Sequence, residues 1–173
     1  MLCGNEVDKD VRGNYYSGME EIAVRGKIKT SLPGELWFGS VYGSIKDMND
    51  SFSLLKENNV SMIWNLLEDD TIAKVESKNF NVIHSPINDF SIPENKESFI
   101  KDIEKIIDLL KDNKNIYVHC FNGHGRTGLA ILCVKIILGE DPTDALKEVK
   151  EKVSGPELQR QINFAFQILD NPS

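Results

Sequence analysis

The chain has 173 residues, of which 40% are hydrophobic and 27% charged, so its composition is that of one ordinary globular domain and not of a disordered or fibrous protein. Its 27 acidic and 20 basic residues give a net charge of −7, which disfavours a general binder of nucleic acid or of a membrane surface. No apolar run approaches the roughly 18 residues of a membrane-spanning helix, and the first residues lack the basic start and apolar core of a signal peptide.

Short apolar runs alternate with helical patterns along the first half of the chain. Residues 1–34 are polar and contain several glycines, and we expect a partly ordered lead-in that is either a mobile arm or a short strand. The segment from Ile87 to Pro93 is predicted to be a loop by its Asn, Asp, Ser and Pro content. Between these segments the pattern predicts a strand at 36–38, a helix over 47–58, a buried strand over 60–67, a short helix over 71–78 and a strand over 80–84.

The second half of the chain continues this alternation. We therefore expect a single α/β domain over residues 35–173, with a central, mostly parallel sheet of about four or five strands and helices on both faces. The elements predicted here are a helix from Phe99 to Leu110, a buried strand at 116–118, an apolar helix over 129–138, a helix from Pro142 to about Lys152, and a last helix with an apolar stripe of Leu158, Ile162, Phe166 and Leu169.

A glycine-rich loop connects the predicted strand at 116–118 to the helix that follows it. A strand, a glycine loop and a helix in this order direct backbone N–H groups and the positive end of a helix dipole toward one point. Gly123 and Gly125 remove side chains where the backbone must curl tightly, and they permit positive φ. The sequence therefore predicts an anion site in this loop.

Four side chains give the loop a more specific chemistry. Cys120 begins it, and a thiol among N–H groups before a helix is stabilised as the nucleophilic thiolate. Arg126 ends it with a planar fork of donors that suits two phosphate oxygens. Thr127 places a hydroxyl beside the sulfur, and His119 could orient the cysteine through its ring or its backbone. This combination predicts phosphoryl transfer to sulfur, followed by hydrolysis of the phosphocysteine.

Such a reaction needs a general acid for the leaving oxygen, and the same group then acts as the base that activates water. Asp89 fits this role best, because it lies in a loop that follows a predicted strand. Asp69 and Asp70 also follow a strand, but their cluster with Glu68 has the pattern of a solvated turn. An Asx-turn or a position at the entry of a helix remains the alternative role for Asp89.

The sequence His119-Cys120-x5-Arg126-Thr127-Gly128 resembles the His-Cys-x5-Arg-Ser/Thr-Gly signature of cysteine-dependent protein tyrosine phosphatases. The short chain and the loop at Asp89 resemble the compact, atypical dual-specificity branch over about residues 35–170. This resemblance implies that Cys120 is the nucleophile, that Arg126 binds phosphate and that Asp89 is the acid and base. It also implies that Gln161 places water, that His124 points out of the loop where it could touch substrate, and that the cradle is formed by the backbone of Phe121, Asn122, Gly123, His124, Gly125 and Arg126.

Other interpretations of the same loop are weaker. The spacing Gly123-x-Gly125-x-x-Gly128 matches the dinucleotide-binding pattern, but no strand is predicted after the following helix. A P-loop NTPase is excluded because Leu129 and Ala130 stand where Lys and Ser or Thr are required. Cys133 is expected in the core, and Cys3 is expected to have no role.

We therefore expect a monomeric phosphoprotein phosphatase that needs neither a metal nor another cofactor. Its partner would be a phosphorylated protein, with phosphotyrosine and phosphoserine or phosphothreonine both allowed, and neither nucleic acid nor a membrane is expected. The alternatives are a phosphatase of phosphoinositides or RNA 5′-phosphates, and a pseudophosphatase that binds substrate without turnover. Three cysteines without paired spacing favour a reducing compartment, and we expect the cytoplasm.

Overall fold

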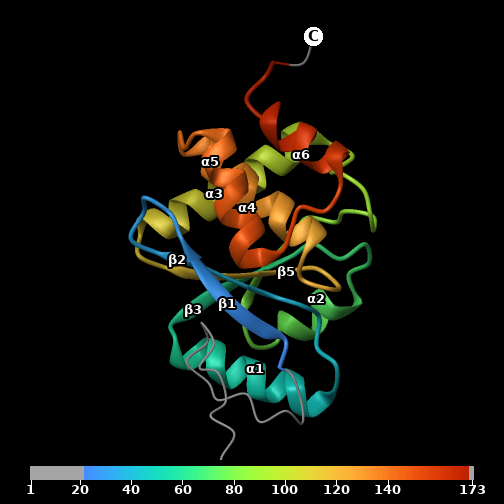
Figure 1. The fold of residues 1–173 in the computed structure, drawn as a ribbon. Helices are drawn as coiled ribbons and strands as arrows, with labels where there is room; N and C mark the ends of the chain where they lie inside the picture. Colours follow the sequence, from blue (N-terminus) through green and yellow to red (C-terminus); the bar gives the residue numbers. More distant parts are fainter. Residues whose placement is uncertain (1–21, 172–173) are drawn as a thin grey trace, which may run out of the picture.

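A computed structural model describes residues 22–171 of the chain (Figure 1). Cys3 and residues 1–21 of the expected lead-in lie outside the described residues. The strands are β1 (Val24–Lys29), β2 (Glu35–Gly39), β3 (Val60–Asn65), β4 (Asn81–His84) and β5 (Asn115–His119). The helices are α1 (Ile45–Glu57), α2 (Thr71–Glu76), α3 (Lys96–Lys111), α4 (Gly125–Ile137), α5 (Pro142–Val153) and α6 (Gln159–Phe166).

The five strands form one sheet in the order β1-β2-β5-β3-β4. The pairs β2–β5, β5–β3 and β3–β4 are parallel, and only β1 runs antiparallel, on the edge beside β2. This confirms the predicted α/β fold with a mostly parallel sheet. The strand β1 lies within the expected lead-in, so the sheet begins before residue 35.

Helices cover both faces of the sheet (Figure 1). The helices α3, α4, α5 and α6 lie on one face, over a core that includes Ile106, Val118 and Leu132. The helix α1 lies on the other face, where Phe52 and Leu55 pack with Ile63. In the part of the chain from 22 to 171, no helix combines the length and the hydropathy that crossing a membrane requires.

Polar side chains fix where three helices begin. Ser44 caps α1 by accepting the Asp47 N–H at 3.0 Å, and Asn95 caps α3 by accepting the Ser98 N–H at 2.9 Å. Asp141 caps α5, and Pro142 occupies its first turn, as the sequence predicts.

Two predicted helices differ from the structure. The helix α4 begins at Gly125 and not at residue 129, because the His124 carbonyl accepts the Gly128 N–H at 2.7 Å and closes a first turn that the glycines do not prevent. Arg126 and Thr127 therefore lie on the helix. The predicted stripe of α6 is wrong at Phe166 and Leu169, which are 38% and 63% exposed, since the helix ends at Phe166 and the residues buried against the core are Ile162, Ala165 and Ile168.

The parallel strands place three loops at one edge of the sheet. Carboxyl ends of parallel strands share an edge, and ligands of open α/β sheets bind outside it. The segments that follow β3, β4 and β5 all begin there, so residues 66–70, 85–95 and 120–124 are brought together from distant parts of the sequence.

Candidate active site

The loop after β5 is held in a tight turn. Gly123 has φ +79°, a conformation that side chains with a Cβ rarely adopt. A Cβ at this position would also lie 2.5 Å from the Gly39 carbonyl oxygen. The loop therefore packs directly on the end of β2, and only glycine fits at its centre.

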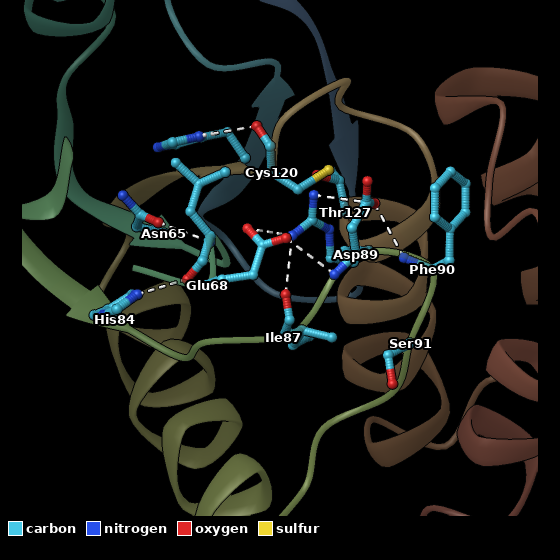
Figure 2. A network of polar contacts seen from close by, with 12 residues as sticks. Asn65, Glu68, His84, Ile87, Asp89, Phe90, Ser91, Cys120 and Thr127 are labelled. Atoms are coloured by element: carbon cyan, nitrogen blue, oxygen red, sulfur yellow. Dashed lines mark hydrogen bonds and ion pairs between the residues drawn. The ribbon is translucent and has the colours of Figure 1, made fainter. Parts of the chain in front are cut away.

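Cys120 lies at the start of this turn and is 2% exposed. Its Sγ accepts hydrogen bonds from Thr127 Oγ1 at 3.1 Å and from the Gly123 N–H at 3.3 Å. Figure 2 shows Cys120 and Thr127 side by side. Two donors on one sulfur stabilise negative charge there, as a nucleophile or a leaving thiolate requires.

The guanidinium of Arg126 joins the three loops. It is 3% exposed, and its Nη1 donates to the Ile87 carbonyl at 2.9 Å. Nη1 also contacts Glu68 Oε2 at 3.1 Å, while Nη2 contacts Asp89 Oδ1 at 3.2 Å. Figure 2 shows the side chain of Glu68 and the carbonyl of Ile87 close to Asp89. The structure thus brings Cys120, Arg126 and Asp89 into one site.

Glu68 has a larger role in this geometry than the expected solvated turn. Besides its contact with Arg126, its Oε1 accepts the Asp89 N–H at 3.0 Å. Burial alone would raise the pKa of Glu68, but hydrogen bonds from its own backbone and from Arg126 and Asp89 lower it overall. Glu68, Asp69 and Asp70 are all exposed, as a solvated turn requires, but the Glu68 carboxylate also contacts Arg126.

A second group of polar side chains lies buried beneath the loop. His119 Nδ1 contacts the Cys120 carbonyl at 3.2 Å, and its Nε2 contacts Glu76 Oε1. The Glu76 carboxylate also accepts hydrogen bonds from the Tyr42 hydroxyl at 2.8 Å and from Asn65 Nδ2 at 2.9 Å. Sequence reasoning missed Glu76, because a glutamate in a six-residue helix carries no signal of a distant partner.

The pKa of Glu76 is lowered by these neighbours. Burial by itself would raise it, since a charged carboxylate is disfavoured away from water. The adjacent His119 and the hydrogen bonds from Asn65 and Tyr42 outweigh that effect. The charged form of Glu76 is therefore part of the folded state.

His124 points away from the pocket. Its Nδ1 is 3.0 Å from the Val153 carbonyl oxygen, and its Nε2 is 3.0 Å from Nη1 of Arg25. Because a carbonyl only accepts, Nδ1 carries the hydrogen and Nε2 can accept from the arginine. The ring expected to touch substrate is thus engaged by the protein itself, and Arg25 is a second neighbour of the loop that sequence reasoning missed.

A pocket opens above Cys120. Gln161, which is 1% exposed, donates from Nε2 to the Ser91 carbonyl at 3.2 Å, so it links α6 to the loop that carries Asp89. Phe90, at the mouth, is 56% exposed and has φ 56°, which is uncommon for a residue with a side chain. Phe121 is 59% exposed. The pocket is lined by Asp89, Phe90, Cys120, Asn122, Gly125, Arg126, Glu157 and Gln161.

These residues provide the parts of a displacement at phosphorus. The sulfur has two hydrogen-bond donors, the guanidinium can exchange its carboxylates for phosphate oxygens, and the carboxyl group of Asp89 lines the same pocket. Among residues 22–171, no group of three or more His, Cys, Asp and Glu side chains could hold a metal ion.

Comparisons with known proteins agree with this geometry. A model of the family described as "Polymorphic toxin system, DSP-PTPase phosphatase" matches residues 39–140. The chain is 37% identical over 83 residues to "Putative tyrosine phosphatase 197R" of Invertebrate iridescent virus 6, a match that covers 46% of this chain and 30% of the viral protein. It is 38% identical over 74 residues to "Putative tyrosine phosphatase 067L" of Invertebrate iridescent virus 3, covering 40% of this chain and 31% of that protein.

The chain thus spans about 30% of the length of the curated relatives it matches. Its fold is similar to the crystal structure of Tk-PTP, with a TM-score of 0.66 and 22% sequence identity. That match covers 79% of this chain and 92% of the other. At this identity the likeness concerns the fold alone.

The buried Glu76 generates a prediction about stability and pH. Its folded-state pKa lies below the ordinary value of 4.5, so its charge stabilises the fold above that pH and this contribution is lost as the pH falls through the folded-state value. We expect Glu76→Gln to lower the unfolding free energy at neutral pH by about 1–3 kcal/mol, because the buried hydrogen bonds become mismatched. The difference in unfolding free energy between this variant and the wild type should become smaller as the pH falls below about 4.5.

Urea unfolding at a series of pH values measures this difference. Glu151→Gln, which changes an exposed glutamate of α5, is the matched control and should unfold as the wild type does at neutral pH. A difference between Glu76→Gln and the wild type that stays constant throughout would contradict the assigned role of the carboxylate.

Proposed function

We propose that this chain, which belongs to the family of DSP-PTPase phosphatases of polymorphic toxin systems, hydrolyses phosphate monoesters of proteins through a phosphocysteine intermediate. The observation that carries the proposal is the convergence on one pocket of a sulfur with two donors, a buried arginine and the carboxyl group of Asp89. A binding module would need the arginine but not the nucleophile or the acid.

In the first step the phosphate replaces Asp89 and Glu68 on the guanidinium of Arg126. The backbone N–H groups of residues 121–126 hold its remaining oxygens. Cys120 Sγ attacks phosphorus, so an S–P bond forms as the ester P–O bond breaks. Asp89, in its protonated form, gives its proton to the leaving oxygen.

In the second step a water molecule attacks the phosphocysteine. The Asp89 carboxylate takes the proton of that water, and Gln161 helps to place it at the pocket wall that the two side chains share. The S–P bond breaks, and Thr127 donates its hydroxyl to the departing thiolate from 3.1 Å. Inorganic phosphate leaves, and the thiolate is restored.

A phosphoprotein is favoured as substrate by the charge around the pocket. The buried arginine contacts the carboxylates of Glu68 and Asp89, and Glu157 also lines the pocket. Each additional phosphate of a phosphoinositide, or the backbone of an RNA, would meet these carboxylates and be repelled. An isolated phosphate on a side chain needs only the loop, the arginine and the acid Asp89.

The chemistry of the site also bears on the compartment. Cys120 and Cys133 are free thiols in the structure, and the proposed mechanism needs Cys120 reduced, so we place the protein in a reducing compartment such as the cytoplasm. We also propose that residues 35–173, together with β1, act as a monomeric catalytic domain on a phosphorylated protein.

The enzyme proposal is tested with Cys120→Ser and an aryl phosphate such as p-nitrophenyl phosphate. The wild type should hydrolyse it, vanadate should inhibit the reaction, and the variant should be inactive because an alcohol is a far weaker nucleophile than a thiolate. Iodoacetamide should modify Cys120 and spare Cys133, whose thiol pKa is raised by burial. A wild-type protein that binds vanadate without any turnover would establish the pseudophosphatase instead.

The role of Asp89 is tested with Asp89→Asn. Because the amide cannot donate a proton, turnover should fall by about 10²–10⁴-fold and the alkaline limb of the pH–rate profile should disappear. The loss should be greater for alkyl than for nitrophenyl esters, since a poor leaving group depends more on the acid. Asp70→Asn, in an exposed aspartate that pairs with Lys74, is the control and should retain both limbs. Survival of the alkaline limb in Asp89→Asn would assign the acid to another residue.

The substrate class is tested with a panel of phosphotyrosine, phosphoserine and phosphothreonine peptides, phosphoinositides and 5′-phosphorylated RNA. We expect the highest kcat/KM with a phosphopeptide, because the acidic surroundings of the pocket penalise further phosphates. A clear preference for phosphoinositides or RNA would contradict the proposal while leaving the phosphocysteine chemistry intact.

A further inference from the structure

We propose that Arg25 is a positioning residue that holds the phosphate-binding loop in its working shape. It acts from β1, which is 97 residues away in sequence from its contact at Asn122. The inference rests on the proposed function, because the shape matters only if the loop binds phosphate.

A loop that binds phosphate through its N–H groups turns its carbonyl oxygens outward, and each of these needs a donor. The Cys120 carbonyl is contacted by His119 Nδ1, and the Phe121 carbonyl accepts the Val41 N–H at 3.1 Å. The next carbonyl, that of Asn122, accepts from Nη1 of Arg25. Three successive carbonyl groups of the loop are thus contacted from β5, from the segment after β2 and from β1, and Arg25 provides the third contact.

Arg25 reaches the loop because of an irregularity in the sheet. In the β1–β2 pair, Val24 lies opposite Gly39 and Gly26 lies opposite Phe38, so Arg25 is the extra residue of a β-bulge. Bulges redirect a side chain and occur beside active sites. Gly39, at the same point, is the residue whose carbonyl the loop packs against. The bulge therefore directs the arginine to the place where the loop rests on the sheet.

The same Nη1 also fixes the end of the loop. It lies 3.0 Å from His124 Nε2, and the other ring nitrogen of His124 is bound to the Val153 carbonyl. His124 is the residue immediately before α4, so its position sets how the helix enters the site. One guanidinium therefore connects the middle of the loop to the start of the helix that carries Arg126 and Thr127.

The contacts of Arg25 should matter more for anion binding than for global stability. The contact with Asn122 is exposed and the contact with His124 is only partly buried, and polar pairs in such positions add little to the unfolding free energy. If they are lost, the peptide between Asn122 and Gly123 can rotate. Its N–H, which donates to Cys120 Sγ, then turns away from the site, and the loop loses the shape in which its other N–H groups meet on an anion. A lysine at this position keeps the charge but lacks the rigid fork, so it should restore only part of the effect.

The test compares Arg25→Met and Arg25→Lys with the wild type. Calorimetry measures the affinity for tungstate, a tetrahedral dianion that is not hydrolysed, and assays with an aryl phosphate give kcat/KM. We expect Arg25→Met to weaken tungstate binding and to lower kcat/KM, each by about 10–100-fold, with Arg25→Lys between it and the wild type. The thermal midpoint should stay near the wild-type value in both variants.

Lys27→Met is the matched control. Lys27 lies two residues further along β1, pairs with Glu35 at 3.2 Å and is absent from the pocket lining, so this variant should bind tungstate as the wild type does. Wild-type affinity in Arg25→Met would overturn the inference. If Arg25→Met does not fold, Arg25→Lys provides the test. Wild-type affinity for tungstate in folded Arg25→Lys would overturn the inference, and a weaker affinity would support it. A wild type that binds tungstate without hydrolysing any phosphate ester would contradict the proposed function alone.

Discussion

The geometry of the site depends on the contacts of one buried guanidinium. Arg126 follows β5 in the sequence, and its partners Glu68 and Asp89 follow β3 and β4. A charged group that is almost fully buried is stable only when it is paired and hydrogen-bonded, so these contacts are a condition of burying the arginine at all. The same requirement brings the loop that carries Asp89 close to Cys120. Folding and the assembly of the site are therefore linked through one side chain.

The loop is supported from below as well. Tyr42, Asn65 and Glu76 form a buried polar cluster with His119, and His119 in turn contacts the Cys120 carbonyl. A buried polar cluster destabilises the fold when some of its groups lack a hydrogen-bond partner. When every group has a partner, the cluster is rigid. Glu76 accepts three hydrogen bonds here, which favours the rigid case. The start of the loop, at Cys120, is thus held by hydrogen bonds from the buried cluster, while residues 122 and 123 pack on β1 and β2.

The features of the fold and of the site that could be predicted are those that depend on residues close together in the sequence. The alternation of strands and helices, and the sequence from His119 to Gly128, are local, and they were sufficient to predict the fold that the structure confirms and to select the residues of the loop. The partners Glu68, Glu76 and Arg25 lie on other elements, and nothing in their neighbourhoods in the sequence indicates a contact. Arg25 in particular depends on a β-bulge, which is a property of two paired strands. The start of α4 was missed for a related reason, since glycine has a low helix propensity but a turn fixed by packing on both sides overrides it.

The charge distribution adds a constraint on what the site can bind. Without substrate, the fork of Arg126 is already occupied by two carboxylates, and Glu157 adds a third at the pocket wall. The phosphate binding that we propose is therefore an exchange of anions, in which the new ligand must make more hydrogen bonds than Asp89 and Glu68 make. A tetrahedral anion that also reaches the backbone N–H groups of the loop would meet this condition, whereas a planar carboxylate would gain little over Asp89 and Glu68 at the arginine. The site thus discriminates among anions by the shape of the loop, and for this reason the groups that hold the loop, from Arg25 on one side to His119 on the other, matter as much as the groups that contact the substrate.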